Sequence, residues 1–371
     1  MALYKSLVKK VSIPAGKKTK QKKYETTGQL AIVDQGKKLI GGYTNNLDML
    51  LKCTLPVIVF GDHTCAVKYV NFPFGAGADG IKVLSPKKGV LPKYLFYGTQ
   101  YLTLRFPDKG YARHYQHIEK MDIPLPPFEE QHRIVSRIEE LFSELDKGVE
   151  TLQTIKQQLA VYRQAVLREA FANCKTITTN EVCVHITDGD HMPPPKAETG
   201  IPFIMISNIK NNQINWDSVN HVNDEYYGTI GEKRTPRFGD VLYTVTGSYG
   251  IPIRVNFRKN FCFQRHIALL RPNERITQDF LFYALQHPDV YFQTTQKATG
   301  TAQKTVGLGV LRKLNIPFCA DINMQTSIVQ KIESRLSVCD SIEQTVDTAL
   351  AQADAMRQSI LKKAFEGGFS E

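Results

Sequence analysis

Apolar residues recur at alternating steps of four and three along two long stretches of the 371-residue chain, one starting at Ile134 and one at Ile328. A repeat of about 3.5 residues predicts a helix with one apolar seam, as in a coiled coil. Prolines stand shortly before both stretches, which is usual where helices begin. Each helix could pack on its own domain, but the unbroken repeat favours pairing of the two helices with each other.

The expected seam is interrupted only by Gly148 in the first stretch and by Arg335 in the second. The seam residues that we single out are Ile134, Ile138, Leu141, Leu145, Leu152 and Leu159 in the first stretch, and Ile328, Ile332, Ile342, Val346, Met356 and Ile360 in the second.

The rest of the chain alternates short β-branched and aromatic runs with turns rich in Gly and Pro. Residues 55–62 and 240–245 are examples of such runs, whose length and flanking turns predict strands. Helices are expected near residues 93–101 and 279–286. These segments therefore predict globular domains that mix α-helices and β-strands.

An internal repeat relates the two halves of the chain. Residues 162–171, YRQAVLREAF, match residues 356–365, MRQSILKKAF, and Leu95-Phe-Tyr matches Leu281-Phe-Tyr. The matches keep one order with small changes of offset, so the chain consists of two copies of one plan. Residues 174–195 have no evident counterpart at the N-terminus.

The predicted fold class is α+β. Two mixed α/β domains stand in tandem and are joined by two long helices that form an antiparallel coiled coil with pseudo-two-fold symmetry. The expected segments are a first domain at 1–122, a first helix at 123–173, a second domain at 174–315 and a second helix at 316–371.

The positive charge lies on the globular segments. The chain has 47 Lys and Arg against 36 Asp and Glu, a net charge of +11. Residues 129–171 carry −2 and residues 321–371 carry −3, so the remainder carries +16. This distribution is typical of nucleic-acid readers joined by a protein scaffold. The first 23 residues hold eight lysines and no acid, and form either a solvated tail or a DNA contact.

Several classes of protein are disfavoured. No apolar run is long enough to span a membrane, and the first residues do not resemble a secretion signal, so we expect a cytoplasmic protein. The seven cysteines form no CxxC pair, which suits free thiols rather than a disulfide framework or a zinc ribbon.

No catalytic or metal-binding constellation stands out. GAGADG at residues 75–80 fits a dinucleotide fingerprint, but a predicted strand follows it instead of a helix, which indicates a turn. A phosphate-binding P-loop is absent, and so is the Asn/Asp-Pro-Pro-aromatic motif of amino-methyltransferases. His185, Asp188, Asp190 and His191 lack metal-ligand spacing and are expected to be turn or surface groups.

The order of these segments resembles the DNA-specificity subunit of type I restriction–modification enzymes. Residues 32–46 and 57–64 resemble words of the family's first target recognition domain. Residues 200–209, 239–250 and 315–319 resemble the second, and residues 123–141 resemble the passage into the first conserved helix.

Subunits of this family are nearly circular in organisation. The resemblance therefore implies that the first domain, which lacks a counterpart of residues 174–195, is either trimmed or completed by the C-terminal tail.

The resemblance also implies a subunit that reads DNA and performs no chemistry alone. Each domain reads one half of a bipartite double-stranded target, and the seam residues also dock two methyltransferase subunits. Those subunits carry S-adenosylmethionine for adenine-N6 methylation, and restriction subunits with a nuclease use ATP and Mg. A seam from Ile134 to Val166 spans about 48 Å, which corresponds to roughly 14 base pairs.

The candidate DNA contacts lie in polar and basic loops, where Arg and Gln read base edges and Lys holds phosphate. They are Gly61, Asp62, His63, Thr64, Lys68, Arg113, His114, Tyr115 and Gln116 in the first domain, and Ser248, Tyr249, Arg254, Arg265, His266, Thr301, Gln303 and Lys304 in the second. For Tyr249 a structural role beside Gly250 is an equal alternative.

Two other functions remain open from the residues alone. One is a stand-alone DNA methyltransferase or nuclease, which the missing motifs disfavour. The other is a coiled-coil adaptor without catalytic activity that is basic for reasons unrelated to DNA.

Overall fold

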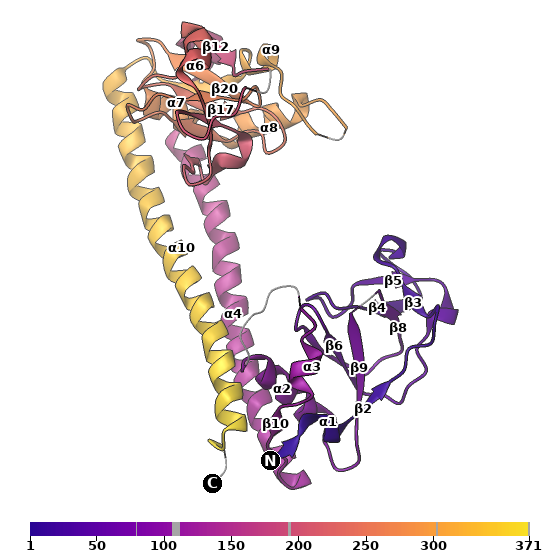
Figure 1. Cartoon of the computed structure of the whole chain (residues 1–371). Coiled ribbons are helices and arrows are strands. Elements are labelled where there is room, and N and C mark those ends of the chain that lie inside the picture. Colours follow the sequence, from indigo (N-terminus) through magenta and orange to yellow (C-terminus); the bar gives the residue numbers. More distant parts are fainter. Residues whose placement is uncertain (79, 106–111, 192–193, 302, 370–371) are drawn as a thin grey trace. The chain divides into compact units, whose positions relative to one another are not determined.

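The computed structural model describes residues 1–78, 80–105, 112–191, 194–301 and 303–369. These residues form two compact units (Figure 1). Unit 1 comprises Met1–Gln153 and Asp347–Glu371, and unit 2 comprises Thr154–Val346. Each unit therefore contains a globular domain and a part of both long helices.

The two long helices are α4, Phe128–Ala170, and α10, Ile322–Phe365. In unit 2, Arg163 of α4 forms an ion pair with Asp340 at 2.7 Å, and Glu169 forms one with Arg335 at 2.7 Å. The partner's number falls as the α4 number rises, so the helices are antiparallel. In unit 1, Arg357 of α10 pairs with Asp146 and lies 4.6 Å from the centre of the Phe142 ring. The predicted antiparallel pairing is confirmed.

Most of the expected seam residues are buried or half-buried. Ile342 and Met356 of α10 are exceptions, with 41% and 53% of their surface exposed. Met356 nevertheless lines a groove between the two helices together with Leu145 and Leu152 of α4, so it stays at the seam. Ile342 is the position that departs from the expected burial. Cys339 and Val346, on either side of Ile342, are buried.

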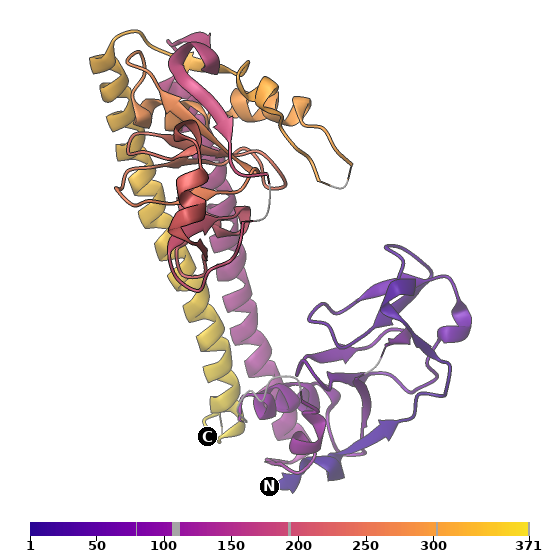
Figure 2. The ribbon, with the colours of Figure 1, turned by 45° about the horizontal axis from the view of Figure 1, so that its top comes forward.

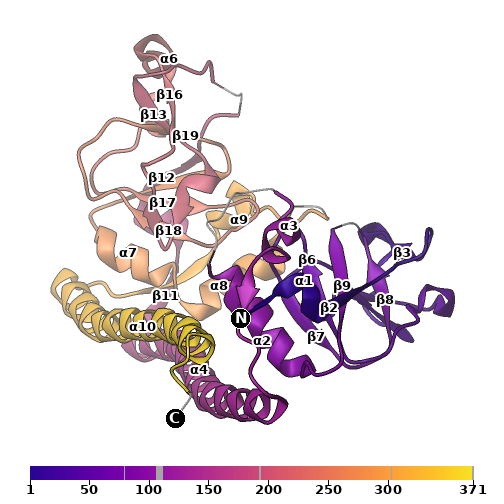
Figure 3. The same ribbon diagram turned by 60° about the horizontal axis from the view of Figure 1, so that its bottom comes forward.

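The globular domain of unit 1 contains two four-stranded sheets (Figure 3). The first has the order β2-β9-β6-β7, formed by Val8–Val11, Ile81–Pro86, Val57–Gly61 and Val67–Val70, and its neighbours are antiparallel. The second has the order β3-β8-β4-β5, formed by Lys18–Thr19, Phe74–Gly77, Leu30–Val33 and Gly42–Thr44. The other elements are β1 (Ala2–Leu3), α1 (Tyr4–Leu7), η1 (Gln21–Lys23), η2 (Leu47–Met49), α2 (Pro92–Thr103), α3 (Tyr115–Ile118) and β10 (Asp122–Ile123).

Unit 2 repeats this plan (Figure 2). Its four-stranded sheet has the order β12-β20-β17-β18, formed by Cys183–Asp188, Ile267–Pro272, Val241–Thr244 and Pro252–Arg254. Its three-stranded sheet has the order β16-β13-β19, formed by Asn220–Val222, Ile201–Ile204 and Cys262–Phe263. The other elements are β11 (Lys175–Thr178), α5 (Thr179–Val182), η3 (Ile206–Asn208), β14 (Ile209–Lys210), β15 (Gln213–Ile214), α6 (Asp224–Thr229), η4 (Glu232–Arg234), α7 (Gln278–Ala284), α8 (Pro288–Lys297), α9 (Leu308–Leu311) and β21 (Asn315–Phe318).

The N-terminal residues have a structural counterpart in unit 2, contrary to the sequence comparison. β1, α1 and β2 correspond to β11, α5 and β12, because β1 pairs with β10 as β11 pairs with β21. Likewise Val8 lies opposite Pro86, and Cys183 lies opposite Pro272. The first domain is therefore not trimmed at this end. The alternative of a solvated N-terminal tail is wrong for residues 2–11, which form two strands and a helical turn.

A buried glutamine joins the start of each long helix to its domain. The side chain of Gln131 accepts a hydrogen bond from the Leu91 amide at 2.8 Å and donates to two carbonyl groups, those of Gly89 and Pro126. Gln325 makes the corresponding three bonds, to the Thr277 amide and to the carbonyl groups of Arg275 and Cys319. Both glutamines are at most 1% exposed. Each buried side-chain amide thus has its hydrogen bonds satisfied by the backbone groups that surround the helix start.

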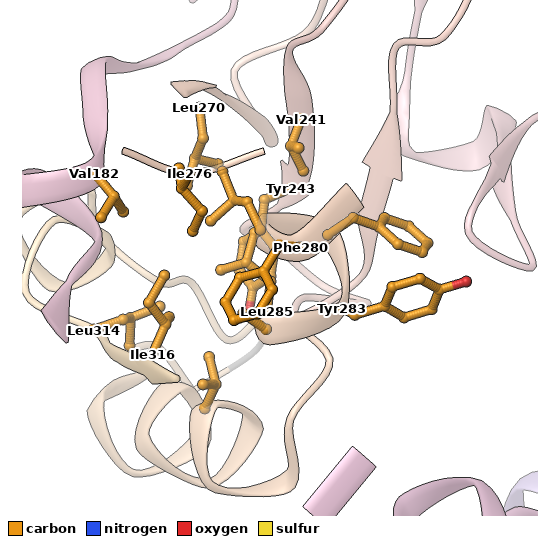
Figure 4. Packing of buried hydrophobic residues seen from close by; sticks show 14 of the residues in the cluster. Val182, Val241, Tyr243, Leu270, Ile276, Phe280, Tyr283, Leu285, Leu314 and Ile316 are labelled. Carbon is orange, nitrogen blue, oxygen red and sulfur yellow. The ribbon is translucent and has the colours of Figure 1, made fainter. Parts of the chain in front are cut away.

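The other end of each long helix closes the core of the unit that contains it. In unit 2 the ring of Phe171, just after α4, lies 5.2 Å from that of Phe280. Phe280 of α7 packs beside Tyr243 of β17 in the core of this unit (Figure 4). In unit 1 the ring of Phe365, at the end of α10, lies 5.0 Å from that of Tyr94. The first domain is thus completed by the C-terminal part of the chain.

Candidate nucleic-acid interface

Three parallel strands of unit 1 end at one edge of their sheet. Lys18 of β3 and Val33 of β4 both lie opposite Ala76 of β8, and both strands run parallel to β8. Residues that follow these strands are consequently close together. The Ala78 amide lies 3.4 Å from the hydroxyl oxygen of Tyr24 and donates a hydrogen bond to it.

Two further loops reach the same edge. The Thr64 hydroxyl donates a hydrogen bond to the carbonyl group of Gln35, which follows β4. The His114 amide donates to the carbonyl oxygen of Asp62 at 2.8 Å, and His63 Nδ1 lies 3.1 Å from the Ala112 carbonyl oxygen. We define the unit 1 loop edge as residues 20–24, 34–36, 61–66, 78, 80 and 112–116.

Unit 2 brings the corresponding loops together. The Val245 amide donates to the His266 carbonyl at 2.9 Å, and the Gly247 amide donates to the Lys304 carbonyl at 3.0 Å. Asp190 forms a parallel bridge with Gln264, which directly follows β19. We define the unit 2 loop edge as residues 188–191, 245–250, 264–266, 299–301 and 303–306. The three candidate stretches that begin at Ser248, Arg265 and Thr301 all belong to it.

Several candidates in unit 1 have structural roles. The carboxylate of Asp62 is buried, accepts the Tyr115 amide at 2.9 Å and lies 3.4 Å from Lys82 Nζ. The ammonium group of Lys68 is 4% exposed and lies 3.4 Å from Asp34. Burial lowers the pKa of Lys68, while the negative charge of Asp34 acts in the opposite direction. Both charged groups are buried and paired, so neither Asp62 nor Lys68 is expected to contact DNA.

The remaining candidates in unit 1 divide by exposure. Gly61, His114 and Tyr115 are buried and shape the loops. Burial is the main cause that raises the pKa of Tyr115. Thr64, Arg113 and Gln116 are exposed and His63 is half-buried, so these four stay predicted DNA contacts.

Most candidates in unit 2 are accessible at the loop edge. Ser248, Arg265, Thr301, Gln303 and Lys304 are exposed, whereas Tyr249 and His266 are half-buried. Burial, and then the positive charge of Arg265, lower the pKa of His266. A neutral imidazole has one donor and one acceptor, which suits a base edge better than a phosphate.

Arg254 and Tyr249 depart from the expected role. Arg254 lies away from the loop edge, where it pairs with Asp279 at 2.7 Å and Glu333 at 3.0 Å. Its guanidinium carbon is 4.5 Å from the centre of the Phe282 ring. Arg254 therefore anchors α7 to α10 and is not expected to contact DNA. The ring of Tyr249 is stacked on that of Tyr291, with centres 6.1 Å apart, which supports the structural alternative for this residue.

Gln35 lies within the unit 1 loop edge and was not among the DNA contacts expected from the sequence. Its Oε1 atom is buried and has no hydrogen-bond partner among the described residues. An unused amide oxygen is costly unless a ligand supplies a donor, and a glutamine amide can bind an adenine edge through two hydrogen bonds. Gln35 belongs to residues 32–46, which carried the family resemblance, but no local pattern distinguished it from its polar neighbours.

The GAGADG segment is followed by a strand, as expected, but its first half is itself a strand and not a turn. Residues 75–77 belong to β8, and β9 begins at Ile81, while Asp79 lies outside the described residues. A Cβ at Gly77 would lie 2.4 Å from that of Asp34, so glycine permits the close approach of β8 and the chain after β4.

The acidic and histidine residues near β12 do not form a metal site within the described part of the chain. His191 Nε2 lies 2.8 Å from Asp188 Oδ2, and the Asp190 carboxylate accepts a hydrogen bond from the Tyr226 hydroxyl. No group of three or more His, Cys, Asp or Glu residues is arranged to hold a metal among the residues described. The described helices also include none that is long and apolar enough to cross a membrane.

Comparison with known families decides the classification. The profile of the family described as type I restriction modification DNA specificity domain matches residues 9–159 and again residues 174–352. The chain belongs to this family. The two matches correspond to the two copies of the plan, each of which has one loop edge.

Individual members of the specificity family show the same relationship. The chain is 27% identical to the type I restriction enzyme EcoBI specificity subunit of Escherichia coli over 66% of its own length and 58% of that protein. It is 24% identical to the EcoKI specificity subunit of Escherichia coli strain K12, over 67% and 57%. The matched part thus spans less than two thirds of these curated relatives.

A solved structure shares the fold over nearly the whole chain. It comes from work on complex assembly and conformational transition of the type I R-M system, and it superimposes with a TM-score of 0.68 at 18% identity. The alignment covers 98% of this chain and 96% of the other. The tandem arrangement of two mixed domains with two long helices therefore also occurs in that structure.

Proposed function

We propose that this chain is the DNA specificity subunit of a type I restriction–modification enzyme and that each unit reads one half of a bipartite target. The observation that carries the proposal is the duplicated loop edge. The same sheet edge, with loops in corresponding positions, occurs once in each unit. Exposed Arg, Gln and Lys side chains at these edges supply the donors and acceptors that base and phosphate recognition requires.

The long helices have a separate role in this proposal. α4 and α10 each extend from one unit into the other, so their length fixes the gap between the two half-sites. Their exposed apolar side chains, which include Val338, Ile342 and Met356, support docking of two methyltransferase subunits. Those subunits bind S-adenosylmethionine and methylate adenine N6, and restriction subunits use ATP and Mg. This chain supplies recognition of double-stranded DNA.

A first experiment tests the role of the chain in the host. Genome-wide mapping of methylated adenine is expected to show a split motif that disappears when the gene for this chain is deleted and returns on complementation. Retention of every methylated motif after deletion contradicts the proposal. Methyl transfer or DNA cleavage by the purified chain alone supports the alternative of a stand-alone enzyme.

A second experiment tests the loop edge of unit 2. Arg265→Ala and Gln303→Ala are expected to relax the methylated motif within one half, because each bidentate base contact contributes about 1–3 kcal/mol of discrimination. Lys313→Ala is the matched control, since Lys313 is exposed in the same unit but lies outside the loop edge. Relaxation in both halves, or an equal effect of the control, contradicts the assignment. Absence of DNA binding by the complex at any salt concentration favours the adaptor alternative.

A further inference from the structure

Four lysines border the loop edge of unit 1. Lys18, Lys20, Lys22 and Lys23 are exposed and lie on β3 and the turn of η1 that follows it. Among the described residues, Lys20, Lys22 and Lys23 form no ion pair with an acidic side chain. We call these four residues the lysine border.

Strand pairing places the lysine border beside the recognition loops. β3 runs parallel to β8 (Figure 1). Thr19 lies opposite Gly77, so Lys20 follows the pairing beside Ala78. The Ala78 amide also donates a hydrogen bond to the Tyr24 hydroxyl, one residue after Lys23. Gly80 then joins this loop to Asp62 through the Asp62 amide. The lysines and the candidate base-reading residues of unit 1 therefore belong to one continuous edge.

Unit 2 carries the opposite charge at the matching position. Its parallel bridge joins Asp190 to Gln264, the residue that directly follows β19, just as Lys20 follows the pairing of β3 with β8. Residues 188–191 are Asp-Gly-Asp-His, and the Asp188 carboxylate lies 2.8 Å from His191 Nε2 and 3.7 Å from the guanidinium group of Arg234. The segment of unit 2 that matches the lysine border has one exposed lysine, Lys196, which directly precedes the bridge of Ala197 with His221. Since the second copy of the fold forms the same edge without a cluster of four lysines, the fold itself does not require that cluster.

We infer that the lysine border binds backbone phosphates of double-stranded DNA beside the half-site that unit 1 reads, and that the matching segment of unit 2, with its single lysine Lys196, binds phosphate more weakly. Exposed ammonium groups attract phosphate regardless of base sequence. Unit 1 thus contributes a larger share of non-specific affinity than unit 2. This inference rests on the proposed function, because it assumes that the loop edges face DNA.

The test uses the full chain purified with its methyltransferase partner and a mixed-sequence DNA duplex as the probe. The test variant combines Lys18→Gln, Lys20→Gln, Lys22→Gln and Lys23→Gln. The control variant combines Lys9→Gln, Lys52→Gln, Lys87→Gln and Lys88→Gln, which removes the same charge. These control lysines are exposed in unit 1, near the opposite ends of its strands, because Lys87 follows the end of β9 and the Leu51 amide bonds to Phe74 at the start of β8.

The test variant is expected to bind the mixed-sequence duplex roughly tenfold more weakly or worse near 0.1 M salt, and to lower the salt-dependence slope by about 3. The control is expected to change the slope by less than about 1. The methylated motif in cells stays the same for both variants. Equal effects of the two variants on binding, a changed motif, or loss of the methyltransferase partner by the test variant overturns the inference. Absence of binding by the unmodified complex instead overturns the proposed function.

Discussion

In each unit a helix of the globular domain is attached to a long helix at a matching place. The helices are α2 and α4 in unit 1, and α7 and α10 in unit 2, and the charges at the contact differ. In unit 1, Lys93 of α2 forms an ion pair with Glu139 of α4 at 2.6 Å. In unit 2, Asp279 and Glu333 stand at the matching positions, and Arg254 of β18 lies between them. A tyrosine donates a hydrogen bond to the glutamate in both units, Tyr97 in one and Tyr283 in the other.

Other contacts differ little between the units. Gln131 and Gln325 bind three backbone groups each, and Phe365 and Phe171 fill the same place in the two cores. Apolar contacts and bonds to the backbone depend on the fold, which the units share. Charged side chains at the surface can change sign when a neighbour changes with them, so one shared fold can carry two loop edges of different charge.

The largest expected effect comes from the aromatic residues at the helix ends. Phe171→Ala and Phe365→Ala are each expected to reduce the free energy of unfolding of their own unit by about 3–5 kcal/mol, because both side chains are buried. Trp216, the only tryptophan, reports on unit 2 by fluorescence during urea unfolding. Phe171→Ala should lower its unfolding midpoint.

Phe365→Ala is expected to leave the Trp216 midpoint unchanged while hydrogen exchange accelerates in α2 of unit 1. A lowered Trp216 midpoint with unchanged exchange in α2 contradicts the assignment of the C-terminal helix end to the first core. Val338→Ala is the control, because this side chain is 58% exposed.

We call Gln131 and Gln325, which bind backbone groups at the helix starts, the glutamine clamps. Their removal should lower the free energy of unfolding by similar amounts in the two units. Gln131→Ala and Gln325→Ala each leave three backbone groups without their partner, and a loss of about 2–3 kcal/mol in unfolding free energy is expected. Gln330→Ala, at an exposed position of α10, serves as the control. Hydrogen exchange of the Leu91 and Thr277 amides measures each clamp separately. If these amides keep their protection in the variants, the clamps do not hold the helix starts.

Removing an ion pair should reduce the free energy of unfolding by different amounts in the two units. Glu139→Gln is expected to cost about 0.5 kcal/mol, because Lys93 and Glu139 are both more than a third exposed and solvent screens the pair. Glu333→Gln should cost about 1 kcal/mol, since Arg254 is less exposed and also contacts Phe282. Unfolding in low and high salt, followed by α2 exchange and by Trp216 fluorescence, compares the two. If the two variants lose equal unfolding free energy with equal salt dependence, the expected difference between the two ion pairs is contradicted.

Lowering the pH should reduce the free energy of unfolding of unit 2 by a small amount. Burial is the main cause that lowers the pKa values of His185, His266 and His287. In the window below the unfolded value of about 6.5, the unfolded chain binds more protons at these sites than the folded unit does, so stability falls as pH decreases. The Trp216 midpoint is expected to drop between pH 7 and 5, and less so when the three histidines are replaced by Asn. An identical pH dependence in that variant rejects this origin.

The parts of the fold that could be predicted from sequence depend on local pattern. The 3.5-residue repeat revealed both long helices, and matched words such as those at residues 162–171 and 356–365 revealed the duplication. β1 escaped detection because a two-residue strand carries no periodic signal. The repeat also did not predict that Ile342 is 41% exposed between the buried residues Cys339 and Val346.

The candidate site was harder to predict because burial of a charge depends on distant partners. Lys68 looked like a phosphate contact, but Asp34 lies beside it only after β4, β7 and β8 have assembled. Arg254 likewise found its partners on α7 and α10. Gln35 became a candidate only when the structure showed its unpaired amide oxygen. In contrast, Arg265 and Gln303 lie in exposed loops, where a polar side chain tends to stay accessible.

The most direct measurement of the central claim exchanges one reader and sequences the methylated motif. Residues 1–122 are replaced by the corresponding segment of a family member with a different half-site, and Trp216 fluorescence confirms that unit 2 stays folded. Genome-wide mapping of methylated adenine is then expected to show one altered half, with the other half and the gap between them unchanged. A motif altered in both halves, or in neither, contradicts the account of two independent readers.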